Sequence, residues 1–256
     1  MSKPIVIAVT NQKGGVGKTT TAINIAYYLA KNGKKTLLID LDPQGNATSG
    51  LGVDKSKIEK SVIDLLVNEA ALGEVAVKTK HKNFFLLPTT SHLANTEVEL
   101  ANLNNKFVRL KKGLSGDNDF DYIIIDSPPS LSLLTVNALI AAQHVLLPVQ
   151  AEFYAMEGLG QLLETMKLVR KGMNPNLELL GVLVTMLDSR TSLSKQVHDE
   201  IKKHFPGKVF ETTIPRNIRL AEAPSHGLPI GAYERWSKGA RAYKAATKEL
   251  LARLEV

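Results

Sequence analysis

The sequence predicts an α/β fold, a single domain in which helices cover both faces of a mostly parallel, twisted sheet. Apolar runs alternate with amphipathic stretches along all 256 residues. Two of the runs, Ile5–Val9 and Tyr122–Ile125, are apolar at every position, as is typical of strands buried on both faces. No internal repeat, low-complexity tract or Pro/Ser-rich linker divides the chain. We therefore expect one domain over residues 1–256.

Each element follows from its apolar pattern and from the residues that interrupt it. The expected strands are Ile5–Thr10, Lys35–Asp40, Phe84–Pro88, Tyr122–Asp126, His144–Pro148, Leu179–Met186 and Lys208–Ile214. The expected helices are Gly17–Lys31, Ser61–Asn68, Thr96–Leu110, Leu133–Ala142, Met156–Lys171, Leu193–His204 and Ser237–Leu254. Val53–Lys60 and Gly113–Asp119 are expected as loops. Crossovers between parallel strands should be right-handed.

Composition places the chain among soluble proteins of the cytoplasm. The hydrophobic fraction is 44% and the charged fraction 22%, which are ordinary values for a globular protein. No apolar run approaches the roughly 20 residues that span a bilayer, and the run near the N-terminus is too short for a signal peptide. The absence of cysteine excludes disulfides and cysteine-held iron–sulfur clusters.

The net charge of +7 is concentrated toward the C-terminus. Residues 186–256 contain thirteen lysines and arginines against eight aspartates and glutamates. This excess is compatible with binding to a phosphate backbone. The alternative is a solvated surface of ordinary lysines, because net charge bears on association and not on fold.

The stretch Thr10–Thr20, TNQKGGVGKTT, carries the strongest functional signal. It follows an apolar strand and precedes a helical pattern, an arrangement that cradles nucleotide phosphates. Backbone N–H groups converge on the anion, Lys18 pairs with the β/γ oxygens, and the Thr19 hydroxyl binds Mg²⁺. The alternative is a plain glycine-rich turn. The expected nucleotide-binding residues of this loop are Lys13, Gly14, Gly15, Val16, Gly17, Lys18, Thr19 and Thr20.

Carboxylates follow two further strands of the expected sheet. Asp40 and Asp42 end the second strand, and Asp126 ends the strand that starts at Tyr122. In open α/β sheets ligands lie off the carboxyl ends of the strands, where these acids should meet the glycine loop. A carboxylate there can orient water or hold Mg²⁺. For the Asp40–Asp42 pair the alternative is capping of the turn at Pro43 and Gly45.

The loop resembles the deviant Walker A loop of the ParA/MinD class of ATPases, with Gln12 where the standard pattern has glycine and a second lysine at Lys13. The resemblance implies ATP and Mg²⁺ as ligands and a catalytic set of Lys13, Lys18 and Asp42. It implies that Lys13 reaches the phosphates of a partner across a dimer interface. It also implies that Asp126, a Walker B acid, holds Mg²⁺ through water beside Thr19.

Within this class the chain resembles the Soj type of chromosomal ParA proteins. The segments that carry the resemblance are Asn11–Thr20, Asp40–Gly50, Asp126–Ser130, Pro148–Gly158, Val184–Thr191 and Ile214–Gly227. The resemblance implies an ATP-dependent homodimer that binds duplex DNA without sequence preference, and a centromere-binding ParB-type partner that stimulates hydrolysis. A nucleoid-associated ATP state in the cytoplasm follows from it.

The resemblance also assigns the adenine and DNA contacts. Pro215 and Asn217 would frame the adenine, although Asn217 at the start of a helix also suits an N-cap. The expected DNA contacts are Arg190, Arg219, Arg216, Lys195, Lys202 and Lys203. Each of these cations has the alternative of being an ordinary exposed charge.

Two rival classes share the loop. A MinD-like membrane ATPase of division-site positioning carries a C-terminal amphipathic anchor, whereas Tyr243–Leu254 lacks a bulky aromatic on its apolar side and suits a packed terminal helix. We therefore expect no stable membrane association. A cluster-carrying relative would need cysteines, and the chain has none.

Overall fold

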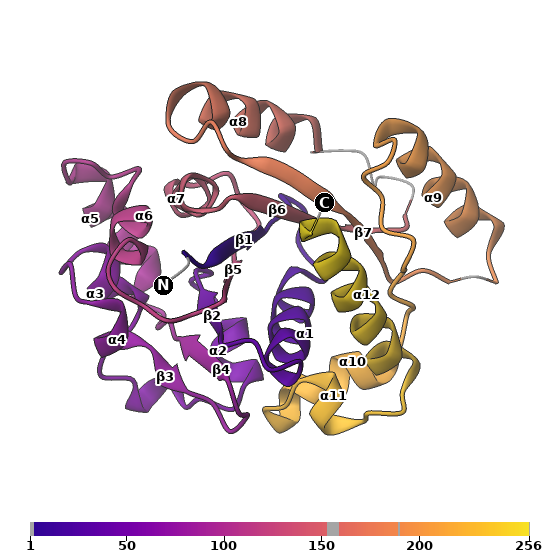
Figure 1. Ribbon diagram of the computed structural model, residues 1–256, viewed down its shortest axis with the longest axis horizontal. Helices are drawn as coiled ribbons and strands as arrows, with labels where there is room; N and C mark the ends of the chain where they lie inside the picture. Colours follow the sequence, from indigo (N-terminus) through magenta and orange to yellow (C-terminus); the bar gives the residue numbers. More distant parts are fainter. Residues whose placement is uncertain (1–2, 153–158, 189, 256) are drawn as a thin grey trace.

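The strands form one seven-stranded sheet in a computed structural model that describes residues 3–152, 159–188 and 190–255 (Figure 1). The strand order is β3-β4-β2-β5-β1-β6-β7. Only the pairing of β3 with β4 is antiparallel among the strand pairs of the described chain. The strands are β1 (Ile5–Val9), β2 (Thr36–Asp40), β3 (Val77–Lys78), β4 (Phe84–Leu87), β5 (Tyr122–Asp126), β6 (His144–Gln150) and β7 (Glu178–Thr185).

Helices cover both faces of the sheet, as predicted, and each face has its own core. Figure 1 shows α1 and α12 on one side and α7 and α8 on the other. The longer helices are α1 (Lys18–Lys31), α5 (Leu93–Asn102), α7 (Leu133–Ala141), α8 (Leu159–Gly172), α9 (Ser192–His204) and α12 (Lys238–Leu254). The shorter ones are α2 (Asn46–Gly50), α3 (Val62–Leu66), α4 (Leu72–Val75), α6 (Arg109–Leu114), α10 (Ile218–Glu222), α11 (Ile230–Tyr233) and the 3₁₀ turns η1 (Lys55–Lys57) and η2 (Ala223–His226).

Successive side chains of the central strand β1 point alternately into the two cores. Val6 and Ala8 enter the core under α7 and α8, whereas Ile7 and Val9 enter the core under α1 and α12. All four side chains are at most 4% exposed. Burial on both faces explains why this strand reads as a continuous apolar run, and the sequence prediction for it is confirmed.

The expected helix Thr96–Leu110 is wrong, because the chain forms two helices there. The first, α5, ends at Asn102, and Asn105 then takes a left-handed backbone with φ +59°. The second, α6, runs through Gly113, which was expected in a loop. A Cβ at Gly113 would lie 2.6 Å from the Leu65 side chain, so the glycine permits close packing of α6 on α3.

The expected strand Lys208–Ile214 is also wrong, although the segment follows β7. The Phe210 N–H donates to the Val182 carbonyl at 2.9 Å, and the Ile214 N–H donates to the Val184 carbonyl at 2.8 Å. Between these two contacts, the N–H groups of Glu211 and Thr212 donate to the Glu249 carboxylate of α12, both at 2.9 Å. In the middle of the segment, the Glu249 side chain thus replaces the strand-to-strand hydrogen bonds with β7.

The remaining expected strands and helices are present with shifts of a few residues at their ends. One expected helix start, Met156, lies outside the described residues, and α8 is described from Leu159. The sequence analysis missed β3 and the short helices α2, α4, α10 and α11. It also read Val53–Lys60 as a loop, whereas a single 3₁₀ turn, η1, lies within it.

Candidate functional site

The glycine loop joins β1 to the start of α1, as the sequence predicts. Gly15 has φ +75° and Gly17 has φ +84°, a left-handed backbone that side-chain-bearing residues rarely adopt. Gly17 is the N-cap of α1, so the unpaired N–H groups of this 14-residue helix face the loop. A helix N-terminus reached through glycine is a favourable site for a phosphate anion.

Two buried side chains fix the loop in place, and sequence reasoning assigned a role to neither. The Asn11 amide donates to the Pro148 carbonyl at 2.7 Å, and its oxygen accepts from the Lys13 N–H at 3.0 Å. The Thr185 hydroxyl donates to the Val16 carbonyl at 2.8 Å. These bonds attach the loop to the ends of β6 and β7. Asn11 could have been suspected from its place directly after β1, but nothing in the sequence pairs Thr185 with Val16.

Lys18 is folded back against its own loop. Its ammonium donates to the Lys13 carbonyl at 3.0 Å, and the side chain is buried. Burial lowers the pKa of Lys18, and the negative charges of Asp126 and Asp42 oppose that shift. The lysine therefore lies between the loop and the two carboxylates, where a phosphate bound in the loop would meet it.

Asp40 and Asp126 are register partners on the neighbouring strands β2 and β5, and both are fully buried. The Asp40 carboxylate accepts the Thr48 N–H at 2.7 Å and the Thr48 hydroxyl at 2.6 Å. Burial raises the pKa of Asp40 to about 6 against the lowering effect of these bonds. Asp40 thus holds α2 to the end of β2.

Asp126 has no such partners. Neither of its carboxylate oxygens accepts a hydrogen bond from any described residue. Burial, and then the charge of Asp40, raise its pKa well above the usual value; the Thr19 hydroxyl lies near enough to lower it without forming a hydrogen bond of normal geometry. A carboxylate buried beside a second one is stable in its ionised form only when a cation or hydrogen-bond donors compensate its charge.

A magnesium ion fits this position. Mg²⁺ is usually bound by one or two carboxylates or hydroxyls together with substrate phosphates, and not by an all-protein cage. No group of three or more acidic or histidine side chains in the described chain could hold a metal by itself. Thr19 and Asp126 are the protein groups that would hold the ion.

Asp42 lies at the mouth of the same site and is 5% exposed. One carboxylate oxygen accepts the Gln44 N–H at 2.9 Å, so the side chain caps the turn that follows β2. Capping of this turn was the alternative role expected for Asp40 and Asp42, and the hydrogen bond from the Gln44 N–H confirms it for Asp42. The charge of Asp42 also acts on Lys18 and Asp126, so the same carboxylate lies close to both of these side chains.

A cavity of about 310 Å³ opens beside the N-terminus of α1. Its wall includes Pro215 and Asn217, the two residues expected to frame a purine. Asn217 is the N-cap residue of α10, yet its side chain makes no capping bond and its oxygen has no partner in the described chain. The other lining residues are Gly17, Thr20, Thr185, Met186, Ile214, Arg216, Ile218, Leu220, Ala221 and Tyr243.

The sequence analysis missed two contributors to this cavity. Met186 has a left-handed backbone with φ +52°, a strained conformation for a residue with a side chain. Tyr243 of α12 is 1% exposed, and its hydroxyl is hydrogen-bonded to that of Thr21 at 3.1 Å. The pattern of α12 predicted a packed face but not its contact with the cavity.

Lys13 lies at the loop entrance with its side chain 37% exposed. Its ammonium is 3.8 Å from one carboxylate oxygen of Glu152, and the Arg216 guanidinium is 3.8 Å from the other. Glu152 thus links the glycine loop to the wall of the cavity. It stands within the segment Pro148–Gly158 that carried the resemblance, but sequence reasoning gave it no role.

The expected DNA-contacting cations do not form one cluster. Arg190 and Arg216 line a second hollow of about 540 Å³ together with Ile218 and Lys238. Arg190 also makes a two-pronged ion pair with Asp188, and Arg219 pairs with Glu222 at 2.8 Å. The three lysines expected at this surface, Lys195, Lys202 and Lys203, lie on α9.

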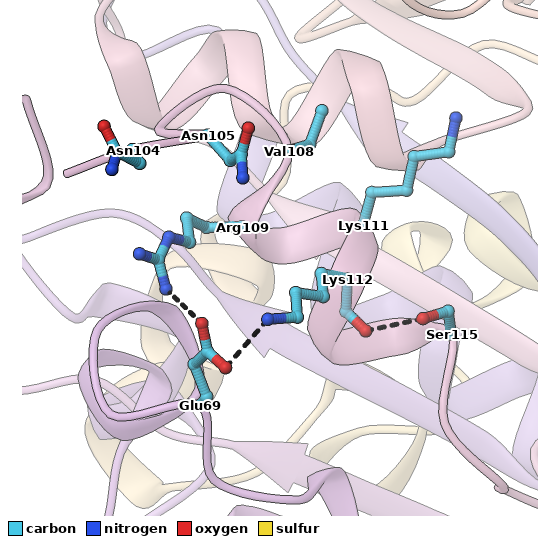
Figure 2. Close-up of a pocket in the computed structure, with 8 residues that line it drawn as sticks. All are labelled: Glu69, Asn104, Asn105, Val108, Arg109, Lys111, Lys112 and Ser115. Carbon is cyan, nitrogen blue, oxygen red and sulfur yellow. Dashed lines mark hydrogen bonds and ion pairs between the residues drawn. The ribbon is translucent and has the colours of Figure 1, made fainter.

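A further hollow of about 560 Å³ lies away from the loop, against α6 (Figure 2). Figure 2 shows the Glu69 carboxylate between Arg109 and Lys112, with contacts of 2.7 and 2.8 Å. One carboxylate is thus shared by two cations. None of the residues that line this hollow is among those expected at the nucleotide or DNA sites.

The apolar face of α12 is covered by the fold, as expected for a packed helix. Tyr243 and Leu250 are at most 1% exposed and belong to the core shared with α1. No helix of the described chain combines the length and apolar character needed to cross a bilayer.

Comparison with known proteins agrees with this geometry. Residues 5–179 match the family model described as an AAA domain. The chain is 53% identical over 248 residues to the sporulation initiation inhibitor protein Soj of Bacillus subtilis, covering 96% of this chain and 98% of that protein. It is 53% identical to the chromosome-partitioning ATPase Soj of Thermus thermophilus, covering 97% and 96%.

A solved structure is also similar to this chain in shape. A protein from Mycobacterium smegmatis described as cobyrinic acid a,c-diamide synthase, solved with ADP and magnesium, superposes with a TM-score of 0.86 at 39% identity over 98% of this chain and 96% of that one. The loop, the paired strand-end acids and the extent of these matches together show that this chain belongs to the ParA/Soj family of P-loop ATPases.

Proposed function

We propose that this protein is an ATP-dependent DNA-partitioning ATPase in which ATP drives formation of a sandwich dimer. The observation that supports it most is the unpartnered Asp126 carboxylate, which faces Lys18 and Thr19 at the start of α1. A Mg²⁺ ion held jointly with a triphosphate would supply the positive charge that this buried acid lacks. The whole of residues 1–256 acts as one ATPase domain in this proposal.

The residues of the site divide the chemistry among them. Backbone N–H groups of the loop and the Lys18 ammonium hold the phosphates, while Asn217 and Pro215 frame the adenine. Asp42 orients the water that attacks the γ-phosphate, a positioning role and not one of strong base. Bound Mg²⁺ would neutralise charge that develops on the phosphate oxygens.

Lys13 completes the site in trans. Its side chain lies at the rim of the loop, and its ion-pair partner among the described residues is the exposed Glu152 carboxylate 3.8 Å away, a contact weak enough to be exchanged for one with a neighbouring molecule. In related phosphoryl-transfer enzymes a cation supplied by a partner accelerates the reaction about 10³–10⁵-fold. We therefore infer that a single protomer hydrolyses ATP very slowly and that dimerisation is a catalytic requirement.

Binding of DNA by the ATP form is supported by a wall that two hollows share. Pro215, Arg216, Asn217 and Ile218 line both the cavity beside α1 and the basic hollow that contains Arg190. A nucleotide that orders this wall also orders the basic surface behind it. The bound polymer in this proposal is duplex DNA of any sequence, because arginine contacts to phosphate oxygens carry no sequence information.

Hydrolysis then resets the cycle. A centromere-binding ParB-type protein stimulates it, and the ATP dimer resides on the nucleoid until that step. The membrane-bound alternative has little support, because the apolar side of α12 is occupied by α1.

The test uses Asp42→Ala, which should bind ATP and fail to hydrolyse it. Size-exclusion chromatography with light scattering is run with ADP, with ATP, and with ATP plus a random-sequence duplex. We expect a monomer, a dimer and a dimer–DNA complex respectively. A monomer that ignores DNA while saturated with ATP contradicts the proposal.

A further inference from the structure

Two large apolar side chains stand exposed beside the basic hollow. Trp236 is 73% exposed and Ile218 is 71% exposed, the two highest values for large hydrophobic residues in the described chain. Ile218 opens α10, a helix that buries none of its residues. Trp236 precedes Ser237, the N-cap of α12. Isolated exposure is common, but a pair on one surface calls for an explanation.

The segment that carries Trp236 lies next to α10, because α10 packs on the start of α12. A Cβ at Gly239 would lie 2.7 Å from the Leu220 side chain, so the helices touch there. Ile218 and Lys238 line the same hollow. Trp236 lies two residues before Lys238, and the Arg235 guanidinium is 4.9 Å from the Trp236 ring centre. We call Ile218, Trp236 and Lys238 the apolar–basic edge.

The charge around this edge selects an anionic occupant. Residues 214–244 contain six arginines and lysines against two glutamates. One of the two glutamates, Glu222, already accepts hydrogen bonds from Arg219 and from the Tyr233 hydroxyl. A second copy of the chain in a two-fold contact would set this positive surface against itself, which is repulsive.

We propose that the apolar–basic edge is a DNA contact in which Ile218 and Trp236 press against the sugars and base edges of a duplex while the neighbouring cations hold its phosphates. Apolar side chains are used in this way by proteins that enter the minor groove. The proposal rests on the DNA binding put forward above and adds a component of affinity that salt does not screen. Arginines release counterions on binding, whereas Ile218 and Trp236 release none.

The experiment measures binding to a fluorescent random duplex at several salt concentrations, with ATP and in the Asp42→Ala background. We expect Trp236→Ala and Ile218→Ala each to weaken binding roughly tenfold at every salt concentration and to leave the log–log salt slope unchanged. Arg219→Ala should instead reduce that slope by about 1. Leu168→Ala, which removes a 70% exposed side chain on α8, is the matched control and should bind as the parent does.

Trp236 is the only tryptophan, so its fluorescence reports on the edge directly. We expect its emission to change when duplex is added to the ATP-saturated protein, beyond any change that ATP alone produces. An emission that stays constant while bound duplex saturates the protein would overturn the proposal. A change produced by an acidic protein partner but not by DNA would also overturn it.

The two levels of failure are separable. If the parent protein does not bind duplex DNA with ATP, the proposed function fails and this inference fails with it. If the parent binds and the Trp236 and Ile218 variants bind equally well, only the inference fails. Both variants change exposed side chains, and circular dichroism with a thermal melt verifies that each remains folded.

Discussion

Gly14→Val distinguishes the stability of the protomer from the stability of the proposed dimer. A Cβ at Gly14 would meet no described heavy atom within 4 Å, and the residue does not have a left-handed backbone. The protomer can therefore accept valine, and we expect the free energy of unfolding to change by at most about 0.5 kcal/mol. A loss of dimerisation in a variant that remains folded and binds nucleotide would then come from contact of the valine with a second molecule.

The expected loss of dimerisation can be estimated. An extra side chain forced into a packed interface costs about 1–3 kcal/mol. A two-fold dimer places both copies of the substitution at the interface, so the penalty is about 2–6 kcal/mol per dimer. At 1.4 kcal/mol per factor of ten, the dimer should be weakened by about 30-fold to 20,000-fold.

Sedimentation velocity over a range of protein concentrations, with ATP and in the Asp42→Ala background, measures this loss. Binding of a fluorescent ATP analogue, measured alongside, should be retained. Gly15→Ala is the comparator: it also has open space around it but has φ +75°, so it should lose about 1–2 kcal/mol of stability. If Gly14→Val dimerises as tightly as its parent, then Gly14 does not lie in the dimer interface and the reasoning is wrong.

Three further predictions address the loop and its supports. Lys18→Ala should abolish binding of the fluorescent ATP analogue, because the ammonium beside Asp126 is removed. Thr185→Val leaves the Val16 carbonyl without its donor and should cost about 1–3 kcal/mol in urea unfolding, whereas Thr185→Ser should not. Burial alone would raise the pKa of Glu249, but bonds from the Thr212 and Glu211 N–H groups and from Arg253 lower it. Because the pKa of Glu249 is lower in the folded protein than in the unfolded chain, where it is about 4.3, the ionised side chain stabilises the fold at pH values above about 4.3. This stabilisation is lost as the pH falls through the pKa of the folded state. Glu249→Gln should therefore reduce the free energy of unfolding more at pH 7 than at pH 3, and an equal loss at both would contradict this.

The fold could be predicted wherever the signal was local. Runs such as Tyr122–Asp126 are apolar throughout because both faces are buried, and this property is written in consecutive residues. The meeting of Asp40 and Asp126 was also predictable, since parallel strands bring their carboxyl ends to one edge. The glycine loop and its helix followed from spacing alone.

The errors have a common physical cause, which is contact between residues far apart in the chain. Glu249 breaks the ladder at residues 211 and 212 from 37 residues or more away. Gly113 lies within α6 in close contact with Leu65 of α3, 48 positions earlier in the chain. Thr185 binds Val16 across 169 positions. Secondary-structure propensity and hydrophobic periodicity depend on neighbouring residues and cannot reveal such contacts. The residues that hold the loop in place were therefore missed, although the charged and hydroxyl groups of the candidate site were identified.

Glu152 shows what these long-range contacts contribute to the proposed cycle. Its carboxylate lies 3.8 Å from both Lys13 and Arg216, so it occupies the position between the loop entrance and the wall shared by the two hollows. Lys13 cannot serve a partner's nucleotide while it stays beside Glu152. Because all three side chains are more than a third exposed, an ion pair of this kind contributes only about 0–1 kcal/mol. The proposed dimer can therefore break the Lys13 contact at little cost, while Arg216 keeps its own pair with the other carboxylate oxygen. Glu152 thus joins the loop lysine to the wall shared by the two hollows through contacts weak enough to be exchanged for contacts with a second molecule.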